Sequence, residues 1–296
     1  MYTLCDLLLG LPGEFTLVQC DRCGLLYLNP SPTWDELKLH YPDRYHPFIG
    51  TIEEQPSALV RWAQRYGVVR RCRAVTQRQH SGRLLDVGCA TGVFLNEMRD
   101  HGDWELYGVE PVASAATFAR QHSGVRIFQG TLLEVAYPDG FFDVVTMWDV
   151  LEHVADPRIY LHEIHRILKP GGWVLIKVPD PWCWEARLFG SFWIGYDAPR
   201  HLFGFPRPAL AHQLGILGFD LVNVRCLAGG FYTFMASLGF WLDAHGWTRS
   251  GRLAQCMARS TIVRVLTAPL FSLVRRLGLG SSLTYFARKR VPAEVG

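Results

Sequence analysis

From about Arg83 onward, short apolar runs rich in Val, Ile and Leu alternate with segments whose apolar residues recur at helical spacing. This alternation is typical of a parallel sheet whose strands are joined by helices, so we predict an α/β fold. The predicted strands are 84–87, 105–110, 125–129, 142–148, 173–178, 220–226 and 282–288. The predicted helices are 93–100, 113–122, one that begins at Pro157 and stops at Lys169-Pro170-Gly171-Gly172, and 208–217.

The remaining chain lacks this alternation and divides into flanking segments. Residues 1–48 form a small segment with one Cys-x-x-Cys, and 49–80 contain a basic linker helix over Ser57 to Arg78. We expect the α/β core to occupy 81–228, and a helical insertion with the last strand to occupy 229–296. Apolar positions over 253–277 place several leucines on one helical face, although Pro269 interrupts the pattern.

Composition excludes several classes of protein. The 296 residues are 49% hydrophobic and 19% charged, which excludes a mostly disordered chain. Eight scattered cysteines in a chain of this length do not suggest a disulfide scaffold. The N-terminus lacks a basic signal-peptide region, and the longest apolar stretch, 228–242, is too short to span a membrane. We therefore expect a cytoplasmic protein that does not cross a membrane.

The net charge of +3 is the sum of two opposite balances. Residues 244–293 contain nine Lys or Arg and no Asp or Glu, whereas the rest has 21 basic and 27 acidic residues. A basic amphipathic segment can lie on an anionic membrane, which would make the protein peripheral through residues 244–290. It can equally pack on its own domain or on a second copy, so the oligomeric state stays open. We expect no nucleic-acid partner, because no recognition motif accompanies the charge.

A turn of small residues follows the first predicted strand. It reads Asp86-Val87-Gly88-Cys89-Ala90-Thr91-Gly92, and Glu110 ends the next strand. Small residues let backbone N–H groups approach a ligand, and a carboxylate in the place of Glu110 can accept hydrogen bonds from both ribose hydroxyls of a nucleoside. The spacing differs from that of dinucleotide binders, and Asp86 favours a cationic ligand over a pyrophosphate. Alternatively, the small residues serve only strand–helix packing.

Together with this turn, four further motifs resemble the class I S-adenosylmethionine-dependent methyltransferases, and in particular the ubiquinone-type O-methyltransferase group. They are Glu110-Pro111, Phe142-Asp143-Val144-Val145, Leu151-Glu152-His153-Val154 and Leu168-Lys169-Pro170-Gly171-Gly172. The resemblance covers about residues 81–228. It implies a Rossmann-like, seven-stranded, mostly parallel sheet with helices on both faces, and S-adenosylmethionine bound over the carboxyl ends of the first strands.

The resemblance also assigns cofactor contacts to residues of this chain. Asp86, Gly88, Ala90 and Gly92 would line the methionine and ribose part, and Glu110 with Pro111 would hold the ribose. The adenine would lie between Thr131 and Leu132 on one side and Trp148 and Asp149 on the other. Two residues depart from the family pattern: Ala90 replaces a glycine, and Thr131 stands where many members have Asp.

Methyl transfer mainly requires alignment of the reactants and exclusion of water. A hydroxyl acceptor also needs a base, and His153 and His201 are the candidates. Alternatively, His153 is only a hydrogen-bonded loop residue, or Asp149, Glu152 and His153 bind a divalent metal, as a related motif does in some members. The aromatic segment 179–206 would supply the substrate contacts Trp182, Trp184, Tyr196 and Arg200, or simply a packed loop.

The stretch Gly10 to Pro32 resembles the zinc ribbon that precedes some family members, but only Cys20 and Cys23 form a complete knuckle. Cys5 and His40 could complete a zinc site, although neither lies in a second knuckle. Our leading hypothesis is a methyltransferase for a small-molecule or lipid-linked acceptor, O-methylation being one option. The alternatives are a catalytically silent S-adenosylmethionine-binding module and a nucleotide-cofactor oxidoreductase. The acceptor atom (O, N or C) stays open.

Overall fold

A computed structural model describes residues 1–41, 51–54, 57–228 and 230–291. It divides into two compact units that each combine distant segments of the chain. Unit 1 comprises Met1–Pro47, Val178–Leu210 and Arg225–Leu283, and unit 2 comprises Phe48–Lys177, Ala211–Val224 and Thr284–Gly296. The linear division into four segments did not anticipate this arrangement, because contacts between distant segments leave no local pattern.

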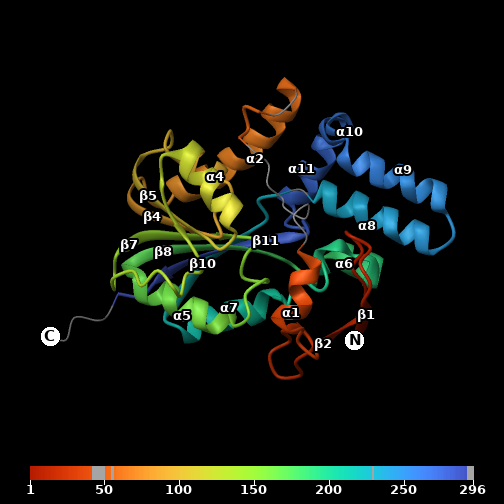
Figure 1. Cartoon of the computed structure of the whole chain (residues 1–296), viewed down its shortest axis with the longest axis horizontal. Coiled ribbons are helices and arrows are strands. Elements are labelled where there is room, and N and C mark those ends of the chain that lie inside the picture. Colours follow the sequence, from red (N-terminus) through yellow and green to blue (C-terminus); the bar gives the residue numbers. More distant parts are fainter. Residues whose placement is uncertain (42–50, 55–56, 229, 292–296) are drawn as a thin grey trace. The chain divides into compact units, whose positions relative to one another are not determined.

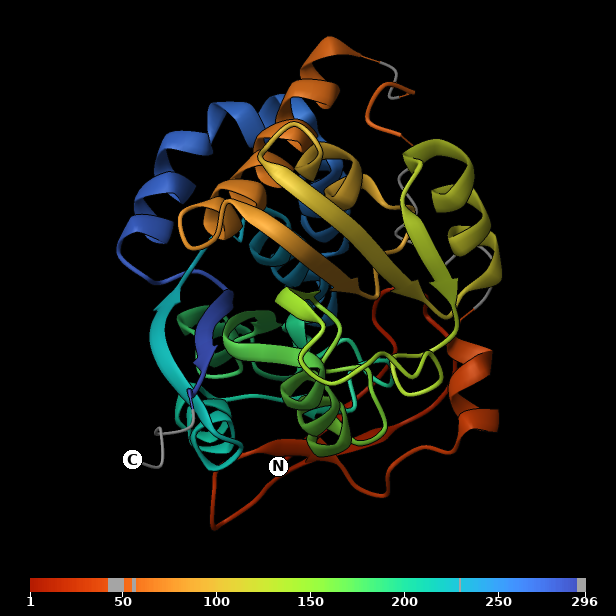
Figure 2. The ribbon, with the colours of Figure 1, turned by 90° about the vertical axis from the view of Figure 1, so that its left-hand side faces the viewer.

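Unit 2 is built on the predicted seven-stranded sheet, with the order β10-β11-β8-β7-β4-β5-β6. The pairs β4–β5, β4–β7, β5–β6 and β7–β8 are parallel, and β4, β5 and β6 end side by side in Figure 2. The bounds are β4 Ser81–Val87, β5 Asp103–Glu110, β6 Arg126–Gln129, β7 Phe142–Trp148, β8 Leu168–Pro179, β10 Phe219–Arg225 and β11 Ser282–Lys289. The seven-stranded, mostly parallel α/β prediction is confirmed.

Helices cover both faces of this sheet, with α4 on one face and α5 on the other (Figure 1). The bounds are α2 Ala58–Thr76, α3 Val93–Met98, α4 Ala113–Ser123, α5 Pro157–Ile167 and α7 Arg207–Ile216. Asp156 caps α5 by accepting hydrogen bonds from the amides of Arg158 and Ile159, and Pro157 takes the favoured first position. The Lys-Pro-Gly-Gly motif lies within β8, where a register shift against β7 marks a bulge.

Unit 1 contains a four-stranded sheet in the order β1-β2-β3-β9, whose neighbouring strands are antiparallel. The bounds are β1 Tyr2–Leu4, β2 Phe15–Gln19, β3 Leu26–Leu28 and β9 Phe203–Gly204. Cys20 and Cys23 lie in the turn between β2 and β3. The strands bury Leu4, Leu17 and Leu28 against aromatic residues of the 179–206 segment, including Phe189, Trp193 and Tyr196. This segment therefore supplies core packing to unit 1.

The other elements of unit 1 are helical. They are α1 Trp34–Leu37, η1 Lys38–His40, α6 Trp184–Phe189, η2 Gly190–Phe192, η3 Ile194–Tyr196, α8 Phe231–Ala244, α9 Thr248–Arg259, α10 Thr261–Leu266 and α11 Ala268–Arg276. The helix predicted over 253–277 is in fact three. Ser260 is extended and caps α10, and a second break at Thr267 precedes Pro269. Within the described part of the chain, no helix is long and apolar enough to span a membrane.

Candidate functional site

The turn after β4 holds its backbone in a conformation that favours glycine. Gly88 and Gly92 have φ values of +71° and +77°, and Ala90 has +49°. A Cβ on Gly88 would lie 2.6 Å from Cγ2 of Val150, so only glycine fits there without displacement. At Ala90 the left-handed backbone costs roughly 1–2 kcal/mol. Ala90 therefore keeps the left-handed backbone that favours glycine, although the residue itself is not glycine.

Glu110 connects this turn to the end of β5. Its Oε2 accepts a hydrogen bond from the Ala90 amide at 2.8 Å, and its Oε1 accepts one from the Val112 amide at 2.9 Å. Burial raises the pKa of the carboxyl, and the two amides lower it by less. An ionised carboxylate can accept about four hydrogen bonds, so two remain for a ligand. The arrangement fits the predicted role in binding ribose hydroxyls.

Asp86 lies at the carboxyl end of β4 and is only 3% exposed. The Thr146 hydroxyl donates a hydrogen bond of 2.6 Å to its Oδ1. Burial raises the pKa of Asp86 to about 7, against lowering by the Thr146 hydrogen bond and by the charge of Arg71. A buried carboxyl of this kind gains most from a cationic ligand, since an opposite charge favours its ionised form. The sulfonium of S-adenosylmethionine is such a cation, so the side chains fit the cofactor that the sequence implied.

Trp148 is the last residue of β7, and Asp149 follows it in the same unit. The Trp148 ring is buried, with Phe94 edge-on at 5.4 Å and the Arg71 Cζ 5.6 Å from its centroid. Asp149 has a left-handed backbone, and its carboxylate pairs with Lys177 Nζ. Of the three residues in the metal alternative, Glu152 and His153 have ligand atoms within 4.8 Å of each other, and among the described residues Asp149 is not part of that set.

The predicted adenine contacts follow β6. Leu132 is fully buried, and the Thr131 amide donates to Oε2 of Glu134 at 2.6 Å. Pro111, directly after β5, is exposed. The predicted cofactor residues thus all lie at or just after the carboxyl ends of β4, β5, β6 and β7, which meet at one edge of a parallel sheet.

Two residues beside Asp86, Thr146 and Arg71, were not predicted from the sequence. Thr146 is the polar position within the otherwise apolar run from Val144 to Trp148 of β7, which is the signal that could have identified it. Arg71 belongs to α2, the helix that the sequence predicted only as a basic linker. Its distance from Asp86 in the sequence left no pattern to find.

The predicted substrate contact Arg200 has a different role. It is completely buried, and each of its five N–H donors has an acceptor. Its partners are the carboxylates of Asp6 and Asp197 and the carbonyl of His40. Burial would raise the pKa of Asp6, but hydrogen bonds from Arg200 and His40 outweigh it and hold that pKa low. Arg200 therefore organises unit 1 and has no donor left for a substrate.

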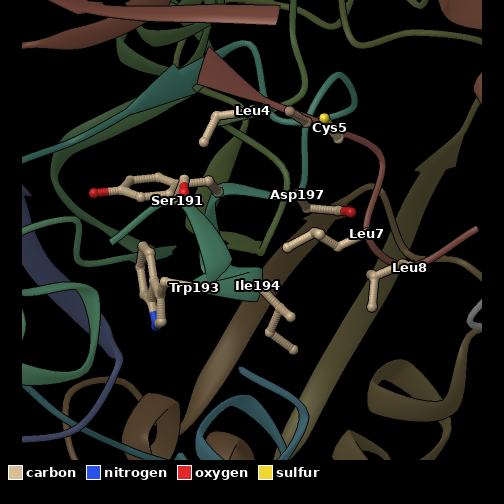
Figure 3. Close-up of a pocket in the computed structure, with 10 residues that line it drawn as sticks. Leu4, Cys5, Leu7, Leu8, Ser191, Trp193, Ile194 and Asp197 are labelled. Atoms are coloured by element: carbon tan, nitrogen blue, oxygen red, sulfur yellow. The ribbon is translucent and has the colours of Figure 1, made fainter. Parts of the chain in front are cut away.

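The predicted aromatic contacts differ in exposure. Trp182 and Trp184 are partly exposed, whereas Tyr196 is buried. Tyr196 also lines a small pocket of unit 1 with Leu4, Leu7, Trp193 and other residues (Figure 3). These positions leave Trp182 and Trp184 as the accessible members of the predicted set.

The two candidate bases belong to different units. His153 lies in a turn of unit 2 after β7, and His201 lies in unit 1. The Nδ1 of His201 is 2.9 Å from the Gly195 carbonyl oxygen. A carbonyl can only accept, so Nδ1 carries the proton and the neutral ring has its lone pair on Nε2.

Two residues could complete the Cys20–Cys23 knuckle as a zinc site, Cys5 and His40. The Nδ1 of His40 bonds to Oδ2 of Asp6 at 2.8 Å instead. Among the described residues, Cys20 and Cys23 belong to no group of three or more ligands. The structure therefore does not bring Cys5 and His40 into one ligand set with this knuckle.

Comparisons with known proteins bear on this site. A family model described as a methyltransferase domain matches residues 54–224, more than half of the chain. The ubiquinone biosynthesis O-methyltransferase of Pseudomonas paraeruginosa is 32% identical over 158 residues, which cover 50% of this chain and 68% of that protein. The demethylmenaquinone methyltransferase of Deinococcus radiodurans is 35% identical over 130 residues, covering 41% of this chain and 53% of that protein.

The fold has solved counterparts as well. A SAM-dependent methyltransferase of Thermotoga maritima matches with a TM-score of 0.51 and 19% identity, covering 77% of this chain and 92% of that one. At this identity the likeness shows the fold alone.

Proposed function

Because this chain belongs to the methyltransferase family, we propose that it transfers a methyl group from S-adenosylmethionine to a quinone-type acceptor, either a small molecule or lipid-linked. The observation that carries the proposal is the Glu110 carboxylate, which holds the Ala90 and Val112 amides and keeps acceptor capacity for ribose. The acceptor class rests on the names of the relatives, a ubiquinone biosynthesis O-methyltransferase and a demethylmenaquinone methyltransferase. We favour oxygen as the methylated atom, as in the first.

In this proposal, S-adenosylmethionine supplies an electrophilic methyl group on a cationic sulfur. Asp86 provides the complementary charge, Glu110 orients the ribose, and Leu132 with Trp148 borders the adenine. His201, whose Nδ1 lies 2.9 Å from the Gly195 carbonyl oxygen, is one candidate for the base that takes the proton of an acceptor hydroxyl. His153 is the second candidate base, and Trp182 and Trp184 are candidate apolar contacts for the acceptor ring.

Calorimetric titration with S-adenosylmethionine, followed by transfer of a labelled methyl group to a water-soluble hydroquinone, tests the proposal. We expect binding that Glu110→Ala weakens, and O-methylated product. Binding without transfer to any phenolic acceptor would favour the silent binding module. Binding of a nicotinamide cofactor instead would favour an oxidoreductase.

A further comparison separates the two histidines. His201→Gln and His153→Gln should be assayed for kcat across pH. Loss of the acidic limb of the profile in one variant identifies the base, whereas an unchanged profile in both excludes a histidine base.

A lipid-linked acceptor would bring the enzyme to a membrane. We therefore also propose that the chain works as a peripheral protein on the cytoplasmic side of a membrane, as its basic segment 244–290 suggested.

A further inference from the structure

Two helices of unit 1 expose an apolar surface. Neither α10 nor α11 contains a buried residue, although most of their residues are apolar. Leu266 is 75% exposed, and Trp247, which precedes α9, is 66% exposed. The exposed apolar side chains of this α9–α11 surface are Leu253, Ile262, Leu266, Leu270, Leu273 and Leu277. Exposed leucines this concentrated usually mark an interaction site.

The same helices carry arginines and have no acidic residue of their own. Residues 244–293 contain no Asp or Glu. The exposed arginines on or beside the three helices are Arg249, Arg252, Arg259, Arg264 and Arg276. The partner must therefore offer both an apolar interior and negative charge.

These requirements distinguish between the candidate partners. A second copy would bring the same arginines against this surface, and like charges that meet at an interface are repelled. An anionic bilayer accepts leucines at its acyl boundary and arginines at its phosphates, and Trp is favoured at that boundary. We propose that the α9–α11 surface binds the anionic headgroup region of a membrane. This inference rests on the proposed function of the chain as a peripheral protein, and it adds which surface binds the membrane and which lipid charge it needs.

The arginine contribution sets the expected size of the effect. Each Lys or Arg close to an anionic surface adds about 1 kcal/mol, which corresponds to about a fivefold change in partitioning. Removing two arginines should therefore weaken binding by about 25-fold at low salt, and salt should weaken the wild type as well.

Flotation of the full chain with phosphatidylcholine vesicles, with and without phosphatidylglycerol, tests the inference. The apolar variant is Leu270→Ser with Leu273→Ser, and its matched control is Ile159→Ser with Ile216→Ser, which are exposed in unit 2. The charge variant is Arg252→Gln with Arg276→Gln, and its control is Arg158→Gln with Arg225→Gln, also exposed. Circular dichroism should verify that each variant is folded.

We expect the wild type and both controls to float only with anionic vesicles, and both surface variants to lose flotation. The inference is overturned if the wild type floats with vesicles that contain only neutral phosphatidylcholine, or if it does not float at all. It is also overturned if the surface variants float as well as their controls. If the wild type binds no vesicle but dimerises with rising concentration, and the apolar variant does not dimerise, the surface binds a second copy and the inference is wrong. Methyl transfer to a water-soluble hydroquinone without lipid separates this result from the proposed reaction, because surface variants should keep the wild-type rate.

Discussion

The carboxyl group of Glu185, on α6, should make the stability of the protein fall as the pH rises. The side chain is completely buried, and neither oxygen has a hydrogen-bond partner among the described residues. Burial raises its pKa from 4.5 to about 8, and the neighbouring Trp193 indole lowers it by less. The folded protein therefore keeps this proton where the unfolded chain has released it.

The stabilising contribution of the proton is complete below the unfolded pKa of 4.5 and is lost as the pH rises through about 8. The difference between the unfolded and folded pKa corresponds to about 5 kcal/mol of unfolding free energy. Structural relaxation around the charged group lowers this energy, so we expect roughly 2–5 kcal/mol. Glu185→Gln preserves the shape of the side chain and removes its titration. The variant should therefore gain stability relative to wild type, by that amount, between about pH 5 and pH 9.

Urea unfolding followed by tryptophan fluorescence at several pH values measures the difference. Asp86 also titrates in this range, but it is present in both proteins and cancels in the comparison. Glu14→Gln, at an exposed position of the same unit, is the matched control and should run parallel to wild type. If the Glu185→Gln curve also runs parallel to wild type, Glu185 does not hold its proton in the folded state and our account of its burial is wrong.

Three further substitutions test the buried polar groups. Arg200→Met should cost about 3–5 kcal/mol of unfolding free energy in urea, because it leaves buried carboxylates unpaired, and a loss below 1 kcal/mol would contradict the buried network. Glu110→Gln sets an amide N–H₂ group against a backbone N–H, so it should cost about 1–3 kcal/mol of unfolding free energy in urea. It should also weaken S-adenosylmethionine binding in calorimetry. The control Asp103→Asn, at an exposed position of the same strand, should change neither quantity. Above pH 7, Asp86→Asn should stabilise the cofactor-free protein by about 1–4 kcal/mol, because it removes a buried charge, yet lower its affinity for S-adenosylmethionine. Equal signs for the two effects would refute this reading of Asp86.

The α/β core could be predicted from sequence because its information is local. The central strands β4, β7 and β8 contain short apolar runs, and Pro157 and Gly92 mark helix starts in the chain itself. The break of the 253–277 helix was only partly visible. Pro269 signalled it, but the extended backbone at Ser260 did not, since serine is tolerated both inside a helix and as its cap.

Unit 1 could not be predicted in the same way. Its central ion pair joins Asp6 to Arg200, which lie 194 positions apart, and no periodicity connects them. In the sequence, Arg200 lies beside a histidine in an aromatic segment, which is typical of a substrate contact. Only its burial in the structure reveals that it pairs with acidic residues of the same chain. The sequence predicted Arg200 as a substrate contact, whereas the structure pairs it with the carboxylates of Asp6 and Asp197.

The buried acids of the two units support different conclusions about function. Glu185 is buried without a hydrogen-bond partner among the described residues, and a neutral carboxyl is a sufficient account of it. Asp86 instead accepts a hydrogen bond from Thr146 and interacts electrostatically with the positive charge of Arg71, and both interactions favour its ionised form. A fold that only needed to fill this position would avoid the cost of a buried carboxyl beside such groups. The cost at Asp86 is offset when a cation binds, which is why its environment, more than the glycines around it, favours a cationic cofactor.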